Sequence, residues 1–227
     1  QNIDATFDKF LSGTATLNHS KTRRSLGAVD DEQGYRWDAG LTANLVNGQL
    51  FPRAYASLHG GIMFIKHAPI WLRASAGQSF ADRNDPQANF ANFYFGGFGN
   101  NWIDFRGVQR FREYYTFPGT ELNKIDGTNF GRLTGEWILP PVRFRSFGSP
   151  MFFVNWARTS LFTSGIVTNY DSDEFKQSYS NVGVQVDIRM VLFSHLKSTF
   201  SIGFARAVDK LTDRQFDELM ISLQILD

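Results

Sequence analysis

The run from residue 182 to residue 190 constrains the fold more than any other part of the chain. Apolar residues at positions 182, 184, 186, 188 and 190 alternate there with Gly183, Gln185, Asp187 and Arg189. Successive side chains of a strand point to opposite faces, so this run predicts a strand with one apolar and one strongly polar face. The same alternation recurs near residues 36–45, 199–205 and 218–225. Helical periodicity is hard to find, and the chain is predicted to be all-β.

About ten strands follow from these runs and from the turn signals between them. They are expected near residues 11–20, 34–46, 49–61, 69–79, 89–97, 128–139, 150–160, 179–193, 195–207 and 216–226. Asn47-Gly48 is a type I′ hairpin signal, and Phe193-Ser194-His195 is a second short connection. The segments 21–33, 80–88, 98–127 and 161–178 are long and polar. Short turns on one side and long loops on the other are typical of an antiparallel outer-membrane barrel.

Composition excludes some classes of function. There are 23 Lys and Arg against 22 Asp and Glu, so no basic excess is available for nucleic-acid binding. The absence of cysteine excludes disulfides and thiolate metal sites. No apolar run reaches the length of about 18 residues that a transmembrane helix needs. No signal peptide is visible at Gln1, so the chain is expected to be mature or a piece of something longer.

A soluble β-sandwich is the main alternative, because its strands alternate too. Two features favour a transmembrane β-barrel. The polar faces carry charged residues over runs longer than the usual sandwich strand of about 5–6 residues, and about 9–11 residues cross a bilayer. Aromatic residues also fall near the expected strand ends, as in interfacial girdles. These aromatics are Trp37, Trp71, Phe93, Tyr94, Phe152, Phe153 and Phe193.

A resemblance takes this reading further. NFYFGG (92–97) resembles the Phe-Tyr-x-Gly-Gly strand end that precedes the long sixth extracellular loop of the Omp85 superfamily, which includes the barrel-assembly protein of Gram-negative outer membranes. GRLTGEWILPP (131–141) and MFFVNWARTSLF (151–162) are similar to the strands that follow. The runs 180–192, 196–208 and 217–226 are similar to the last three strands. The chain is also similar to the barrel of envelope proteins that couple a periplasmic β-propeller to a surface-antigen-type barrel.

This resemblance implies a location in the bacterial outer membrane and a part in inserting or translocating proteins. No covalent chemistry and no cofactor are implied. Family barrels have sixteen strands, so residues 1–227 are expected to form the last ten, with 98–127 as a long loop folded into the lumen. An open ten-stranded sheet would expose unpaired backbone groups to lipid. The chain is therefore expected either to close on itself or, as favoured here, to pair with a second polypeptide that supplies the missing strands or periplasmic domains.

The resemblance also implies roles for particular residues. Gly96 and Gly97 would release the loop from the wall. Arg112 is the candidate for the loop arginine that docks on the inner wall, and Arg106, followed by glycine, is its rival. Glu136 falls on the position of the wall carboxylate, and Asn155 falls where the family usually has aspartate. The alternative is that Arg112 and Glu136 are separate solvated charges.

The sequence gives only weak signals for catalysis or metal binding. The four histidines are not spaced like metal ligands, and no Gly-x-Ser-x-Gly nucleophile motif exists, so an enzyme is not predicted. Asp30-Asp31-Glu32 and the acidic residues 171–174 are read as solvated loop charge rather than cation sites. A passive pore or a surface-anchoring barrel remains the alternative function.

Overall fold

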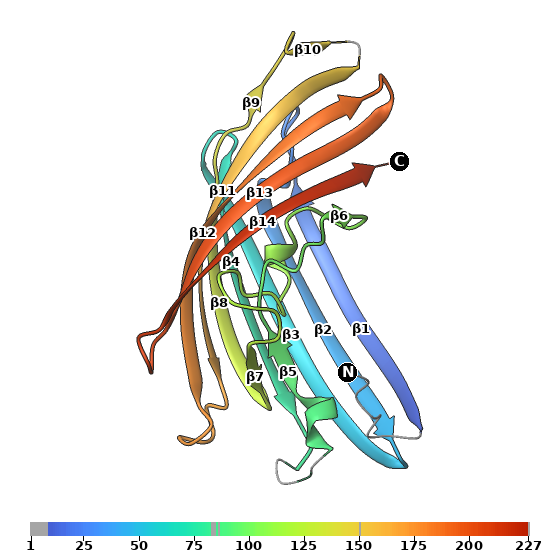
Figure 1. Ribbon diagram of the computed structural model, residues 1–227, viewed down its shortest axis with the longest axis vertical. Helices are drawn as coiled ribbons and strands as arrows, with labels where there is room; N and C mark the ends of the chain where they lie inside the picture. Colours follow the sequence, from blue (N-terminus) through green and yellow to red (C-terminus); the bar gives the residue numbers. More distant parts are fainter. Residues whose placement is uncertain (1–8, 83–84, 86, 150, 227) are drawn as a thin grey trace, which may run out of the picture.

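The structure is a computed structural model that describes residues 9–82, 85, 87–149 and 151–226. Within these residues the fold is all-β, and nine long strands form one curved antiparallel sheet in the order β1-β2-β3-β4-β8-β11-β12-β13-β14 (Figure 1). Their bounds are β1 Phe10–Arg23, β2 Gln33–Val46, β3 Gln49–Ile65, β4 Ala68–Ser79, β8 Asn129–Ile138, β11 Phe152–Thr168, β12 Gln177–Leu192, β13 Leu196–Asp209 and β14 Gln215–Leu226. We call this sheet the wall.

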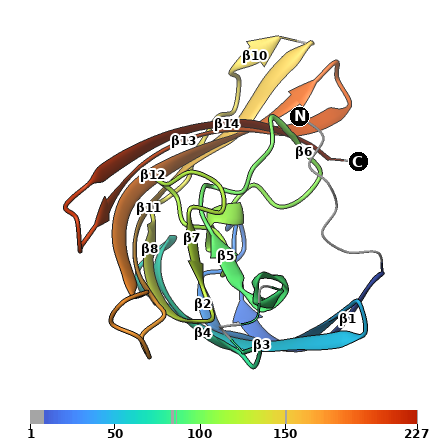
Figure 2. The same cartoon turned by 60° about the horizontal axis from the view of Figure 1, so that its bottom comes forward.

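The wall is not closed into a barrel. In the described part of the chain, β1 pairs only with β2, and β14 pairs with β13 and, over two residues, with β6 (Ile103–Asp104). Figure 2 shows the wall curving around a central segment and leaving a gap between β1 and β14. The prediction of an antiparallel β-fold is confirmed, and the observed wall is an open one.

Residues 89–97 do not form a wall strand, so the prediction of about ten strands was wrong by one. This segment instead holds the 3-10 turn η1 (Ala88–Ala91) and the short strand β5 (Phe93–Phe95). β5 pairs with β7 (Ile125–Gly127) in a separate two-stranded sheet inside the curve. Both phenylalanines of β5 are buried, because they share the face that packs on the concave side of the wall, while Tyr94 between them points away and is exposed.

Because residues 89–97 are not a wall strand, the connections are distributed between the two ends of the sheet differently from the prediction. The Asn47-Gly48 turn and the Phe193–His195 turn lie at opposite ends, whereas the sequence placed both short turns on one side. The predicted loop 161–178 is also shorter, because β11 continues to Thr168. Its residues keep alternating between exposed and buried, with Phe162 and Ile166 on the concave face.

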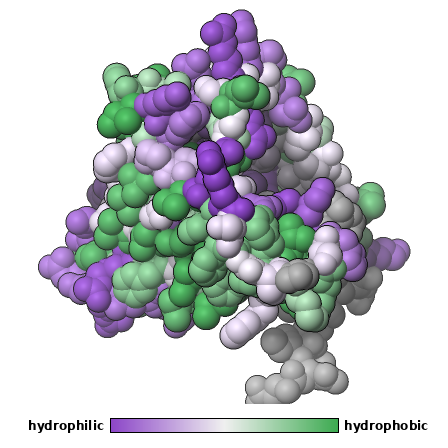
Figure 3. Space-filling view, turned by 90° about the horizontal axis from the view of Figure 1, so that it is seen from above, coloured by the Kyte–Doolittle hydropathy of each residue, from purple (hydrophilic) through white to green (hydrophobic). Residues whose placement is uncertain are grey.

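Polarity in the wall is reversed relative to a soluble protein. Apolar side chains on the convex face are exposed, such as Val182 at 61% and Leu133 at 59%. Polar side chains on the concave face are buried, and Gln185 and Asp187 are fully inaccessible. Figure 3 shows hydrophobic residues spread over the outside of the molecule among hydrophilic ones. The period-two pattern of the sequence therefore places apolar side chains on the exposed convex face, and buried polar and aromatic side chains on the concave face.

A long segment fills part of the concave side. We call residues 96–124 the inner loop; it contains β6 and the 3-10 turn η2 (Arg110–Arg112). Its aromatic side chains pack on wall residues, as in the stacked pair Phe111–Phe162 with ring centroids 4.5 Å apart. Two aromatics expected near the rims, Trp71 and Phe93, also face inward and are buried. Two further short strands, β9 (Val142–Arg143) and β10 (Gly148–Ser149), pair with β11 at one end.

Candidate functional site

The inner loop meets the wall through a buried ion pair. The turn η2 carries Arg112, whose Nε and Nη2 donate hydrogen bonds of 2.8–3.2 Å to both carboxylate oxygens of Glu136. Glu136 lies on β8 with its side chain on the concave face and fully buried. A guanidinium and a carboxylate that meet at two atoms each form a strong, directional contact. The structure therefore brings together the two residues that the resemblance placed at this contact.

Glu136 has a second cationic neighbour. Arg73 on β4 places Nη2 2.5 Å from Glu136 Oε2, and its side chain is 3% exposed. This contact is an ion pair by distance, although it lacks the alignment of a hydrogen bond. One buried carboxylate therefore pairs with two guanidinium groups, and removing it would leave each of these cations with one partner fewer.

A second carboxylate comes from the connection between β1 and β2. Asp30 Oδ2 lies 2.7 Å from Arg112 Nη2 and 3.0 Å from Nη1 of Arg158, which is on β11. Burial opposes the charged form of Asp30, but Arg112 and Arg158 outweigh it and lower the pKa of Asp30 to about 2. Burial likewise opposes the charge of Arg112, but Glu136 and Asp30 raise the pKa of that guanidinium above its usual range.

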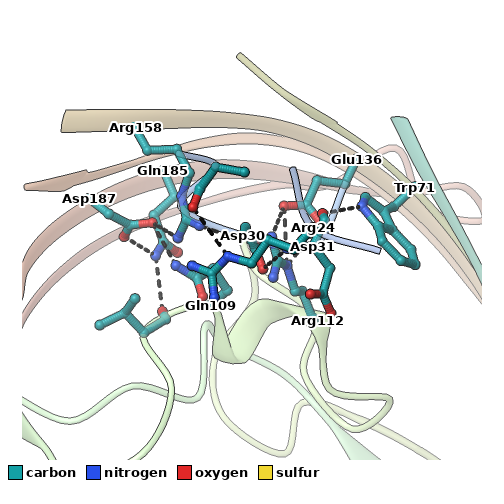
Figure 4. A network of polar contacts seen from close by, with 12 residues as sticks. Arg24, Asp30, Asp31, Trp71, Gln109, Arg112, Glu136, Arg158, Gln185 and Asp187 are labelled. Carbon is teal, nitrogen blue, oxygen red and sulfur yellow. Dashed lines mark hydrogen bonds and ion pairs between the residues drawn. The ribbon is translucent and has the colours of Figure 1, made fainter. Parts of the chain in front are cut away.

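Arg158 carries the network to a third carboxylate. Its Nη2 lies 2.7 Å from Asp187 Oδ2 on β12. Asp187 also accepts hydrogen bonds from Gln109 of the inner loop, at 2.8 Å, and from Gln185 and Ser201 of the wall, each at 2.7 Å. Figure 4 shows Arg112 and Gln109 reaching from the loop toward Glu136 and Asp187 on the wall, with Asp30 between them. Every carboxylate of this network is thus matched by donors from two or more elements.

Two further wall residues hold the backbone of the inner loop. Glu218 on β14 accepts hydrogen bonds from the backbone N–H groups of Phe98, at 3.0 Å, and Gly119, at 2.8 Å. On the opposite side, Arg132 of β8 donates to the backbone carbonyls of three loop residues, at 2.6–3.2 Å. Those residues are Phe111, Glu113 and Tyr114. The loop is therefore attached along its length, and the Arg112–Glu136 pair is one of several fixed points.

The remaining sequence-predicted residues lie elsewhere. Asn155 sits at the bulge of β11, and within the described part of the chain it forms no hydrogen bond with Arg112. Its backbone carbonyl accepts a hydrogen bond from the N–H of Phe144 at 3.0 Å. The rival Arg106 is exposed, and its backbone carbonyl accepts a 2.5 Å hydrogen bond from Gln224. Gly96 and Gly97 begin the inner loop with φ of +155° and +66°. Arg112, rather than Arg106, is the arginine that reaches Glu136.

Sequence reasoning missed most of the network. Asp187 lies on the polar face of the run 182–190, so alternation already placed it on the same side as the inner wall. Asp30 had no such signal and was read as solvated, which is wrong because it lies in two ion pairs. Its neighbour Glu32 is also buried, 2.5 Å from His67 Nδ1. Across the described ranges, no group of three or more His, Asp or Glu side chains is arranged to hold a metal ion.

Comparisons with known proteins give no family for this chain. No family model matches it, and neither does any curated protein or any solved structure. In the part of the chain that the structure describes, no helix is long and apolar enough to cross a membrane.

Proposed function

We propose that this chain is part of an Omp85-like transmembrane β-barrel of the bacterial outer membrane, with a role in inserting proteins into that membrane or translocating them across it. The observation that carries the proposal is a wall with an exposed apolar outside and a buried polar inside, holding an inner loop through Arg112 and Glu136. In a bilayer the exposed apolar face contacts lipid, and the polar face lines a lumen. Further strands, from a second polypeptide or a longer chain, complete the wall, because lipid does not tolerate open sheet edges.

The mechanism is conformational and involves no covalent step. The inner loop occupies the concave side, and its contacts come from strands on both halves of the wall. Tyr55 of β3 stacks on Tyr114 and Glu136 of β8 pairs with Arg112, while Asp187 of β12 and Glu218 of β14 accept hydrogen bonds from the loop. A loop tied to both halves couples its own position to the curvature of the wall. Releasing the loop would therefore loosen the wall where proteins pass.

Fractionation and depletion in a Gram-negative host test this proposal. The protein should sediment with outer membranes, resist carbonate extraction and change its gel mobility on heating, and its depletion should lower the level of other outer-membrane proteins. Recovery in the soluble fraction would contradict the membrane location. Recovery in the outer membrane without any effect on other proteins would contradict the role in insertion.

A passive pore or anchoring barrel is the second candidate, and one observation favours it. A cavity of about 730 Å³ stays open between the inner loop and strands β1–β3. Single-channel recording in planar bilayers separates the candidates. A large steady conductance indicates a passive pore, whereas a small flickering one indicates a lumen that the loop obstructs.

A further inference from the structure

The cavity beside the inner loop has an excess of basic side chains that the network around Glu136 does not use. Four arginines line it, at positions 36, 106, 110 and 112, together with His59. Two carboxylates line it, those of Asp38 and Glu113. Arg112 is already bonded to Glu136 and Asp30, which leaves Arg36, Arg106 and Arg110 as the other arginines that line the cavity.

The wall side of the cavity places basic groups in direct register. Arg36 on β2 is paired with His59 on β3, and His59 is paired with Arg73 on β4. Adjacent strands lie about 4.8 Å apart, so these three side chains are close neighbours on one face of the wall. Arg73 is matched by Glu136. The other two members of this row face the cavity instead.

Arg36 and His59 have donor or acceptor atoms without partners. Within the described residues, Arg36 forms no ion pair with a carboxylate, and its Nε is buried without a hydrogen bond. Its guanidinium is held over the ring of Trp71, 5.4 Å from the centroid. His59 approaches Asp38 with Nε2, at 3.7 Å, and its buried Nδ1 has no partner. Unpaired buried polar groups are costly, so both side chains keep hydrogen-bonding capacity for a group that enters the cavity.

The loop side adds complementary donors. Arg110 is 15% exposed, and its carboxylate contact, to Asp104, is long at 3.6 Å. Its Nη2 lies 3.3 Å from the hydroxyl of Tyr115, which also lines the cavity. A ligand in the cavity would therefore meet guanidinium groups from the wall and from the loop at the same time.

We infer that this cavity binds an oxyanion, a phosphate or carboxylate group, between Arg36 and His59 of the wall and Arg110 of the inner loop. Guanidinium groups suit such ligands because their planar N–H forks match two oxygens at once. The bound group is either a free anion or the headgroup of an acidic lipid. This inference is independent of the proposed function, because it concerns binding to the purified protein.

Equilibrium dialysis of the purified protein in detergent, with radiolabelled inorganic phosphate at constant ionic strength set by sodium chloride, tests this site. We expect saturable binding. Arg36→Gln and, separately, Arg110→Gln should each weaken it by about tenfold or more, the loss of one strong contact. Arg189→Gln is the matched control: this wall arginine bonds Thr199 at 3.2 Å and lies outside the cavity. It should bind phosphate like the parent protein.

Dihexanoyl phosphatidic acid, added as competitor, distinguishes the two sources. Displacement at concentrations well below those of unlabelled phosphate indicates a lipid headgroup, and equal or weaker competition indicates a free anion; both outcomes support the site. Linear, non-saturable uptake of phosphate would overturn the inference, as would full binding by both cavity variants. Arg110 lies on the loop, so its variant keeps the test valid even if Arg36→Gln fails to fold.

Discussion

Glu136 is the wall carboxylate that holds the loop arginine Arg112. It is the ion-pair partner of both Arg73 and Arg112, and it is fully buried. A buried pair contributes little beyond well-packed apolar residues, but removing one partner leaves an uncompensated charge. The consequences of losing Glu136 should therefore exceed those of losing any exposed charge on the molecule.

We predict that Glu136→Gln lowers the free energy of unfolding by about 3–5 kcal/mol, because two buried guanidinium groups lose their shared carboxylate. Urea unfolding in detergent measures this change. Protease cleavage within the inner loop should become faster at the same time.

The matched control is Asp217→Asn, which breaks the exposed ion pair between Asp217 and Arg206. Exposed ion pairs are screened by water and contribute little to stability, so this variant should resemble the parent protein. Equal effects of the two substitutions would show that the buried pair contributes no more to stability than the exposed pair does.

Among the elements, the inner loop depends on the glycine at which it leaves β5. Gly96 has a φ of +155°, and a Cβ there would lie 2.0 Å from the backbone oxygen of Glu121. That oxygen belongs to the returning part of the same loop, so a side chain at position 96 forces the two passes of the loop apart.

We expect Gly96→Ala to destabilise the fold by about 1–3 kcal/mol through backbone strain and displacement of the loop. Thermal unfolding followed by circular dichroism is the measurement. Gly165→Ala is the control, because a Cβ at this position on β11 meets nothing within 4 Å. A Gly96→Ala protein as stable as the control variant would contradict the role of this glycine.

Elements were predictable from sequence where their signal is local. The alternation at 182–190 correctly gave β12 with Asp187 inward, because strand periodicity depends only on neighbours along the chain. The failure at 89–97 has the opposite cause: whether an aromatic run joins the wall or packs inside it depends on Phe130 and other distant residues. The contact of Asp30 with Arg112 joins two loops, and no periodic pattern reports on such a pair.

For the whole molecule, the decisive property is the exposed apolar convex face. Leu133 lies near the middle of β8 and is 59% exposed. In water, replacing an exposed leucine by a charged residue changes stability little. In a bilayer, an arginine facing lipid near the midplane costs about 2–4 kcal/mol.

We therefore predict that Leu133→Arg slows or prevents folding into phospholipid vesicles and lowers stability there by about 2–4 kcal/mol. Leu26→Arg, in the connection between β1 and β2, serves as the control because Leu26 is fully exposed outside the wall. Folding yield in vesicles, read from heat-dependent gel mobility, measures the difference. Identical yields for both variants would argue against contact between the convex face and lipid.

The direction of the two edge strands has a consequence for how the wall can be completed. Eight successive antiparallel pairings lead from β1 to β14, so the two strands run the same way. Joining them directly would require a parallel seam. An antiparallel seam on both sides instead requires an odd number of additional strands, which makes the total even, as in bacterial outer-membrane barrels. A sixteen-stranded barrel would draw seven strands from elsewhere, and parity alone rules out six.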